Sequence, residues 1–265
     1  MRERRDEVIV ATKAGVAWSF EPGLRIWREA SADYIRMACD RSLKALGLDV
    51  IDIYQVHWPV SDVPAEETMG AMRELRDAGK IRAIGVSNYG QEDLAAAGAA
   101  GPLDSLQVGY HLMRREVEET ELDWCRAHDV GVLAYGPLAH GLLTGKMDER
   151  TTFEPNDWRG QSELFSDSLY PERVAVVREL QQVADEAGRP GGVAELAVAW
   201  VLRRPEVTSA IVGSRNADQA RRNAALAGAP LSADEAATID DVLARHPDVG
   251  RHYGHGEPPP KEAAA

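Results

Sequence analysis

Short apolar runs alternate with longer amphipathic segments along most of this 265-residue chain. Each run is rich in valine, isoleucine or leucine and shows little polar–apolar alternation, which is typical of a strand covered on both faces. Alternation of strands with helices, without a block of strands alone, predicts a parallel sheet in an α/β fold. The predicted strands are Val8–Thr12, Val50–Val56, Ile81–Val86, Ser105–Gly109, Val130–Tyr135 and Ser209–Val212.

The segments between and after these strands have helical periodicity and recognisable helix ends. Ser31 is a candidate N-cap for the first of them and Gly47 a candidate stop. Residues 141–170 show no clear element, and a loop of this length is typical of either a functional lid or a disordered segment. The predicted helices are Ser31–Leu46, Pro64–Ala78, Gln91–Ala97, Glu116–His128, Pro171–Ala187, Val193–Arg204, Asn216–Leu226 and Ser232–Arg245.

Charge, cysteine content and length limit the partners, the cellular compartment and the number of domains that we expect for this chain. The formal net charge of -13 disfavours nucleic-acid and membrane partners, because an acidic surface repels phosphate. Two cysteines, Cys39 and Cys125, form no disulfide framework and suit a reducing cytoplasm. We found neither an apolar run of membrane-spanning length nor a signal peptide. The length predicts one domain over residues 1–250, and residues 251–265, rich in proline and glycine, are predicted as a flexible tail.

Polar groups follow the predicted strands. In a parallel barrel the C-terminal strand ends share one rim, where catalytic residues lie. Each group has a structural interpretation as well: a lysine after a strand can be a solvated charge, a histidine a buried hydrogen-bonding residue, and a Ser-Asn pair a turn. Their joint placement on one rim favours a functional site. The groups are Lys13 after Thr12, His57 with Trp58, Ser87 with Asn88, Gln107 with Tyr110, Tyr135 with Gly136 and Pro137, and Gly213 with Ser214 and Arg215.

Several segments around these groups resemble the aldo-keto reductase family. They are Val10-Ala-Thr-Lys13, Ile51-Asp-Ile-Tyr-Gln-Val-His57-Trp-Pro59, Gly79-Lys-Ile-Arg-Ala-Ile-Gly-Val-Ser87-Asn88, Tyr135-Gly-Pro-Leu-Ala-His-Gly-Leu-Leu-Thr-Gly145, and Ile211-Val-Gly-Ser-Arg215 with Gln219 and Asn223. The resemblance runs from about Glu7 to Leu243. It implies a (β/α)8 TIM barrel that binds NADPH without a Rossmann motif, and this chain contains no G-x-G-x-x-G segment.

The resemblance also implies roles for individual residues. Lys13 corresponds to the lysine that lowers the pKa of the catalytic tyrosine, and His57 to the histidine that orients the substrate carbonyl. Three groups correspond to those that hold the nicotinamide carboxamide: Ser87, Asn88 and Gln107. The other implied cofactor contacts are Tyr135 on the nicotinamide ring, the backbone of Leu138, Gly141 and Leu143 at the pyrophosphate, Ser214 and Arg215 at the 2′-phosphate, and Gln219 and Asn223 at the adenine.

The family pattern breaks at the N-terminus. The family places a catalytic aspartate and tyrosine at the end of its second strand and just after it, whereas this chain begins just before the counterpart of the third. We therefore predict a truncated form with about six βα units, impaired because it lacks the catalytic tyrosine. Tyr54 and Tyr110 are the nearest replacements by strand position. Six strands also leave an eight-strand barrel open, which predicts a homo-oligomer or strand exchange that covers the edges.

Three functions fit this sequence. The first is NADPH-dependent reduction of a small-molecule carbonyl, an aldehyde or ketone, with no metal. The second is a non-redox reaction on the same rim, such as a dehydration, cyclisation or isomerisation. The third is a non-catalytic nucleotide-binding or interaction subunit. Trp18 and Trp58 are candidate substrate contacts, because their rings could line an apolar and aromatic pocket. For Trp18, which follows the first strand end, the family resemblance also implies a substrate contact.

Overall fold

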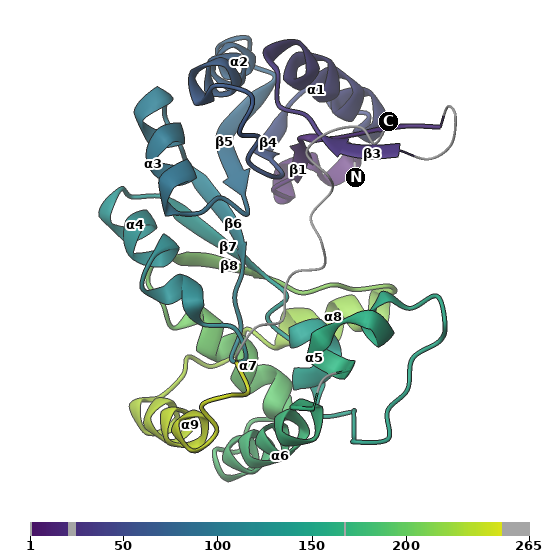
Figure 1. The fold of residues 1–265 in the computed structure, drawn as a ribbon, viewed down its shortest axis with the longest axis vertical. Helices are drawn as coiled ribbons and strands as arrows, with labels where there is room; N and C mark the ends of the chain where they lie inside the picture. Colours follow the sequence, from purple (N-terminus) through teal and green to yellow (C-terminus); the bar gives the residue numbers. More distant parts are fainter. Residues whose placement is uncertain (1, 21–24, 167, 251–265) are drawn as a thin grey trace. The chain divides into compact units, whose positions relative to one another are not determined.

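The computed structural model describes residues 2–20, 25–166 and 168–250 (Figure 1). One sheet holds the strands in the order β1 (Ala11–Ala14), β4 (Ile51–Val56), β5 (Ile81–Ser87), β6 (Ser105–Gly109), β7 (Gly131–Tyr135) and β8 (Val207–Ile211). The first four of these strands pair in parallel. The predicted α/β fold with six strands is confirmed, and each strand is followed by at least one helix.

The first strand begins later than its apolar pattern predicts. Val8 N donates to Arg5 O at 3.4 Å, and Val10 N donates to the Asp52 carboxylate at 2.8 Å. The same carboxylate accepts from Arg5 at 2.7 Å, so it ties the approach to β1 against β4. A turn and a side chain thus take the N–H groups of Val8 and Val10, and β1 covers Ala11–Ala14, although Val10 O still accepts from Asp52 N and Ile53 N at 3.1 Å.

The predicted helices form with small changes at their ends. Helices α1 (Ala32–Leu46), α2 (Ala65–Asp77), α3 (Gln91–Ala100) and α4 (Glu121–Ala127) follow β3, β4, β5 and β6. Helices α6 (Tyr170–Glu186), α7 (Gly192–Leu202), α8 (Ala217–Ala225) and α9 (Ala233–Arg245) lie in the second half of the chain. The predicted helix at 116–128 is divided, because a separate 3-10 turn, η2 (Glu116–Glu118), precedes α4.

Of the two serines at helix N-termini, Ser232 caps its helix through its side chain and Ser31 does not. Ser232 accepts from Glu235 N at 3.2 Å while Glu235 accepts from Ser232 N at 2.8 Å, which is a capping box at the start of α9. Ser31 occupies the N-cap position of α1, but its side chain makes no capping bond within the described part of the chain. The Ser31 N–H instead donates to Glu29 at 2.9 Å.

Several short elements were not predicted. An antiparallel hairpin of β2 (Val16–Ser19) and β3 (Arg25–Arg28) follows β1. The prediction that residues 141–170 lack structure is wrong, because they include part of η3 and the whole of two further helices. Elements this short carry no measurable periodicity. The short helices are η1 (Arg2–Glu7), η3 (Ala139–Thr144), η4 (Trp158–Gln161) and α5 (Glu163–Ser166).

The described residues fall into two compact units. Unit 1 contains residues 2–108 and 119–132, and unit 2 contains residues 109–118 and 133–250. The single domain over residues 1–250 stays a prediction, and the predicted tail at 251–265 lies outside the described residues. Within the described part of the chain, no helix is long and apolar enough to cross a membrane.

Each unit has its own apolar core. In unit 1, α1 and α2 lie beside β4 and β5 (Figure 1) and bury Ile35, Cys39 and Met72. In unit 2, α6 packs against α7 and α9, and the fully buried residues include Trp200 on α7 and Ile239 on α9. Burial of such side chains stabilises a fold by about 1.5–3 kcal/mol each. The two cores fix the strand ends and loops that carry the predicted site residues.

Candidate functional site

The ends of β1 and β4 place Lys13 beside His57 in unit 1. Lys13 pairs in register with Gln55, and His57 N donates to Ala14 O at 2.8 Å. Gly15 follows with φ +103°, and a Cβ there would lie 3.0 Å from His57 N, so a side chain at this position would be strained. The turn after β1 therefore needs glycine to bring the two strand ends together.

Burial changes the proton affinity of both groups. It lowers the pKa of the Lys13 ammonium. It also lowers the pKa of His57 to about 4, with a further contribution from the charge of Lys13. His57 is therefore neutral at pH 7, where it can donate one N–H hydrogen bond but carries no charge. Lys13 is the cation of this pair.

A second polar group of unit 1 lies at the ends of β4, β5 and β6. Asn88 N donates to Gln107 O at 3.0 Å, and Asn88 Nδ2 donates to His57 O and to Ser87 Oγ, each at 3.1 Å. Asn88 has φ +59°, the left-handed conformation that asparagine tolerates. The structure thus brings Ser87, Asn88 and Gln107 together with His57 in unit 1.

Gln55 supports this group from inside the sheet. Gln107 Nε2 donates to Gln55 Oε1 at 2.9 Å, and Gln55 Nε2 donates to Ser105 Oγ at 3.4 Å. All three side chains are buried, so these bonds satisfy amides that would otherwise destabilise the fold. Gly85 makes room for them, because a Cβ there would lie 2.3 Å from Ser105 Oγ.

The two candidate substrate residues lie in different surroundings. Trp58 is half-buried, and the Arg28 guanidinium lies 5.0 Å above its ring. Arg28 Nη1 also donates to Pro59 O at 3.2 Å, which fixes the base of the β2–β3 hairpin beside Trp58. Trp18 is 62% exposed on β2 and touches Phe20 edge-on at 5.1 Å. Trp58 is next in sequence to His57, whereas Trp18 faces solvent.

Neither candidate tyrosine replaces the family acid. Tyr54 is buried and lies on the opposite face of β4 from Gln55 and His57, since strand residues alternate. Tyr110, in unit 2, donates its hydroxyl hydrogen to Glu118 at 2.5 Å and accepts from Arg203 at 3.0 Å. Burial raises the pKa of both phenols. The Tyr110 hydroxyl is therefore a structural hydrogen-bonding group, whereas Tyr54 is buried on the other face of β4.

Unit 2 contains a cavity of about 1120 Å³ at the C-terminal ends of β7 and β8, which we call the rim cavity. It gathers predicted cofactor residues from the end of β7, from η3 and from the loop and helix after β8. These are Tyr135, Leu138, Gly141, Ser214, Arg215, Gln219 and Asn223. Four cationic side chains lie around it, Lys146, Arg159, Arg215 and Arg222, with Asp157 as the single carboxylate among its described lining residues.

Side chains of α8 hold the loop after β8 in place. Asn223 Nδ2 donates to Gly213 O at 3.0 Å and to Ser214 Oγ at 2.9 Å. Gln219 Oε1 accepts from Arg215 N at 2.7 Å. Asn216 caps the helix by accepting from Gln219 N at 2.9 Å. The loop that carries Ser214 and Arg215 is thereby bonded to α8. Gln219 and Asn223 are four residues apart, so both side chains lie on the helix face that meets this loop.

Two predicted residues of unit 2 are more enclosed. Burial raises the pKa of Tyr135 to about 12, so its ring offers a neutral aromatic face to the rim cavity. Leu143 is fully buried, and its N–H donates to Leu138 O at 3.1 Å. Leu143 shapes the turn of η3 and does not line the cavity within the described part of unit 2.

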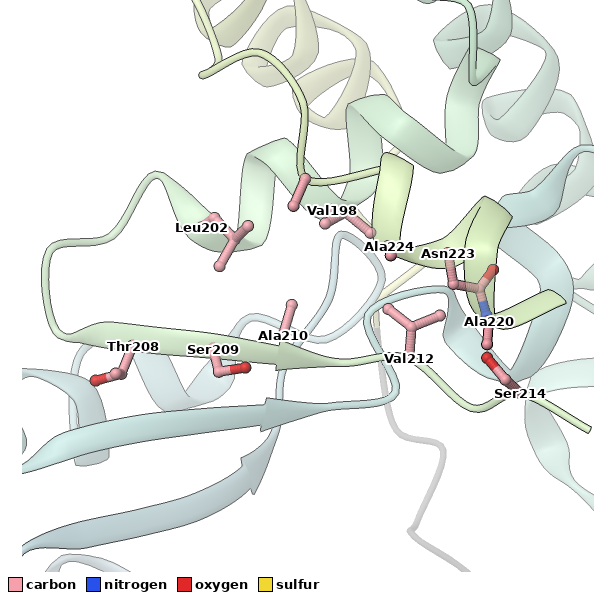
Figure 2. Close-up of a pocket in the computed structure, with 11 residues that line it drawn as sticks. Val198, Leu202, Thr208, Ser209, Ala210, Val212, Ser214, Ala220, Asn223 and Ala224 are labelled. Atoms are coloured by element: carbon pink, nitrogen blue, oxygen red, sulfur yellow. The ribbon is translucent and has the colours of Figure 1, made fainter. Parts of the chain in front are cut away.

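A smaller cavity lies behind the same loop. Figure 2 shows it between α7, β8 and α8, with Val198 and Leu202 on one side and Ala224 on another. Its volume is about 470 Å³, and it shares Val212, Ser214 and Asn223 with the rim cavity. The two cavities therefore adjoin at the Ser214–Asn223 hydrogen bond.

Comparison with known proteins decides the family. The sequence model of the aldo/keto reductase family matches residues 1–244. The chain is 39% identical over 241 residues to the aldo-keto reductase YhdN of Bacillus subtilis, covering 91% of this chain and 71% of YhdN. The chain belongs to the aldo/keto reductase family.

Solved structures agree with this assignment. The structure of this aldo/keto reductase is similar to that of the glycerol dehydrogenase AKR11B4 from Gluconobacter oxydans, with a TM-score of 0.87 and 33% identity over 97% of this chain and 78% of the other. Its sequence is also 30% identical to the NADH-specific methylglyoxal reductase of Escherichia coli, covering 90% of this chain and 75% of that protein. The predicted TIM-barrel relationship is confirmed, whereas the absence of two βα units stays a prediction.

Sequence reasoning missed several residues of this aldo/keto reductase site. Gln55 lies two residues before His57, so the period of two places both on one face of β4, and that signal could have been used. Arg159 and Asp157 lie in a segment without periodicity, and no sequence signal places them at the cavity. The described residues contain no group of histidine, cysteine or carboxylate side chains that could hold a metal.

Proposed function

We propose that this chain binds NADP(H) and reduces the carbonyl group of a small aldehyde or ketone. The observation that carries this proposal is the rim cavity of unit 2, which combines predicted cofactor residues with four cations in a chain whose net charge is -13. A dinucleotide carries phosphates that need such donors, and apolar and aromatic groups such as Tyr135 and Pro137 suit its rings. The residues present therefore fit this cofactor.

The nicotinamide end of the cofactor needs hydrogen-bonding groups that fix one face of the ring. Ser87, Asn88 and Gln107 offer amide and hydroxyl groups that are themselves held by neighbours. We assign them to the carboxamide. When bound, the cofactor supplies the hydride, and the chain's own residues orient the carbonyl and supply hydrogen-bond donors to its oxygen.

Lys13 and His57 are the donors for that oxygen. His57 is neutral at pH 7 and donates a hydrogen bond, whereas Lys13 carries the charge that stabilises a developing alkoxide. Proton donation by a positioned acid contributes about 10²–10⁴-fold. Tyr110 is held by Glu118 and Arg203, so we do not assign it as the proton donor.

The test is NADPH oxidation with a panel of aldehydes and ketones. We expect turnover in the wild-type chain that falls at least about tenfold in His57→Ala and in Lys13→Met. Lys44→Met, at an exposed position of α1, is the matched control and should leave turnover unchanged. NADPH binding with no turnover for any carbonyl would favour the nucleotide-binding subunit instead, and turnover of non-carbonyl substrates would favour the non-redox reaction.

Cofactor preference is tested separately, because a relative carries the name NADH-specific methylglyoxal reductase. The Arg215 guanidinium is suited to bind a 2′-phosphate, which NADPH has and NADH lacks. We therefore propose that Arg215 makes the chain prefer NADPH. Arg215→Gln should weaken NADPH binding by about tenfold and leave NADH binding within about twofold. Arg221→Gln is the control, since Arg221 pairs with Asp218 at 2.8 Å and is not among the described cavity residues. Equal affinity for both cofactors in the wild type would refute the preference.

A further inference from the structure

A buried amide crosses from one strand of unit 1 to the next but one. Gln55 on β4, Gly85 on β5 and Ser105 on β6 pair in register. The Gln55 side chain reaches past β5, and its Nε2 lies 3.4 Å from Ser105 Oγ. Gly85 allows this, because a Cβ there would lie 2.8 Å from Gln55 Cγ and 2.3 Å from Ser105 Oγ. The glycine of the middle strand therefore lets a side chain of β4 bond to one of β6.

The oxygen end of the same amide holds Gln107. Gln107 Nε2 donates to Gln55 Oε1 at 2.9 Å, so Gln107 Oε1 is the end turned away from Gln55. None of the described residues donates to that oxygen. Gln55 is 0% exposed, whereas Gln107 keeps 7% of its surface exposed. The orientation of an amide follows from its hydrogen bonds, so the buried partner decides whether Gln107 presents an acceptor or a donor.

We propose that Gln55 is a positioning residue, which turns Gln107 so that Oε1 accepts a hydrogen bond from the carboxamide NH₂ of the nicotinamide. This inference rests on the proposed function, because that function assigns Gln107 to the carboxamide. Gln55 is too deeply buried to touch a ligand, so it acts through Gln107. A Gln107 amide held in one orientation accepts only one orientation of the carboxamide, whereas an amide that rotates presents either end.

Calorimetry on the full chain compares NADP⁺ with 3-acetylpyridine adenine dinucleotide phosphate, in which a methyl group replaces the carboxamide nitrogen. The wild type should bind NADP⁺ about tenfold more tightly than this analogue, because the analogue leaves Gln107 Oε1 without its donor. In Gln55→Leu the preference should fall to about twofold, because the released Gln107 amide can turn its nitrogen toward the acetyl oxygen. Ser105→Ala removes the anchor of the Gln55 amide and should give an intermediate preference.

Thr68→Val is the matched control. Thr68 is also buried in unit 1, and its hydroxyl donates to Ala30 O at 2.8 Å, so this variant loses a buried hydrogen bond that does not involve Gln107. It should be less stable than the wild type but keep the full preference for NADP⁺. The double variant Gln55→Leu/Gln107→Leu should show the preference of Gln107→Leu alone, because Gln55 acts through Gln107.

A preference that stays near the wild-type value in folded Gln55→Leu and in Ser105→Ala would overturn the positioning role. A wild type that binds both dinucleotides equally would overturn the orientation of Gln107 while the proposed function stands. A wild type that binds neither NADP⁺ nor NAD⁺ would instead defeat the proposed function. The bond to Gln55 is tested without cofactor by NMR: a Gln107 amide proton should exchange with water more slowly in the wild type than in Gln55→Leu, and equal rates would overturn it.

Discussion

At the residue scale, single side chains decide whether the strand ends can form a site. The buried amides of Gln55 and Gln107 bond each other, and Gly85 leaves the space that they occupy. An added methyl group there has no room, because Ser105 Oγ and Gln55 Cγ lie 2.3 and 2.8 Å from the Cβ position. Packing of this layer therefore depends on a residue with no side chain.

Gly85→Ala should destabilise the chain by about 1–3 kcal/mol, as overpacked cores do. Urea unfolding of the purified variant gives the measurement. Gly70→Ala is the control, because Gly70 lies inside α2 with nothing within 4 Å of its Cβ position. That change should stabilise the chain by about 0.5–1 kcal/mol through helix propensity. Equal stability of the two variants would contradict the packing argument for Gly85.

The second residue-scale prediction concerns the pH dependence that His57 confers. Its folded pKa is lowered to about 4, below the ordinary value near 6.5, so the unfolded state binds the proton more tightly. The stability that neutral His57 contributes is complete above about pH 6.5 and is lost as pH falls toward 4. When the pH falls from about 7 to about 5, the unfolding free energy of the wild type should therefore decrease more than that of His57→Asn. A pH-independent difference would contradict the lowered pKa.

At the element scale, a charged cluster joins α6 and α9 in unit 2. His246, just after α9, lies 3.0 Å from Glu172 and 2.9 Å from Glu179, both on α6. Arg245 also pairs with Glu179. These partners raise the pKa of His246, Glu172 first. The helices are held by apolar packing, and this cluster adds a contribution that depends on pH.

Replacement of His246 by glutamine should have its largest effect in acid. The folded pKa is raised, so the stabilisation is complete below about pH 6.5 and is lost as pH rises through the folded value. His246→Gln should lower the unfolding free energy at about pH 5.5 more than at about pH 8.5, the opposite trend to His57→Asn. Denaturant melts at both pH values measure this. A larger effect in base would refute the ion-pair assignment.

At the scale of the whole molecule, the sheet has two outer strands. β1 stands at one end of the strand order and β8 at the other, so each has one hydrogen-bonding neighbour among the described strands. Apolar side chains lie exposed beside them: Ile9 is 78% exposed before β1, and Ile211 is 39% exposed at the end of β8. Exposed strand edges of this kind favour pairing with another chain.

We therefore expect the 265-residue chain to associate as its concentration rises, as measured by sedimentation. Ile9→Lys should shift the equilibrium toward the monomer, because a charge beside the edge opposes strand pairing. Met37→Lys is the control, since Met37 is also an exposed apolar residue, at 38%, but lies on the helix α1 and not next to a strand end. A clean monomer at all concentrations would disprove strand exchange between subunits.

The amino-acid sequence by itself determined the order and type of the main elements. Six apolar runs and the longer helices appear where periodicity and ending residues predict them, because these signals are local to each element. The sequence also indicated the family through the residues at the strand ends, and the family match over residues 1–244 confirms it. Short elements such as the β2–β3 hairpin escaped prediction, since four-residue strands carry almost no periodic signal.

Only the tertiary structure decided which side chains support those strand ends. The bond between Gln55 and Gln107 joins residues 52 positions apart, and Arg159 reaches the turn at Gly141 from a segment without regular pattern. The lowered pKa of His57 depends on burial beside Lys13, which no local sequence window contains. Local propensity selects elements, whereas contacts between distant residues, and the water that packing excludes, set hydrogen bonds and proton affinities.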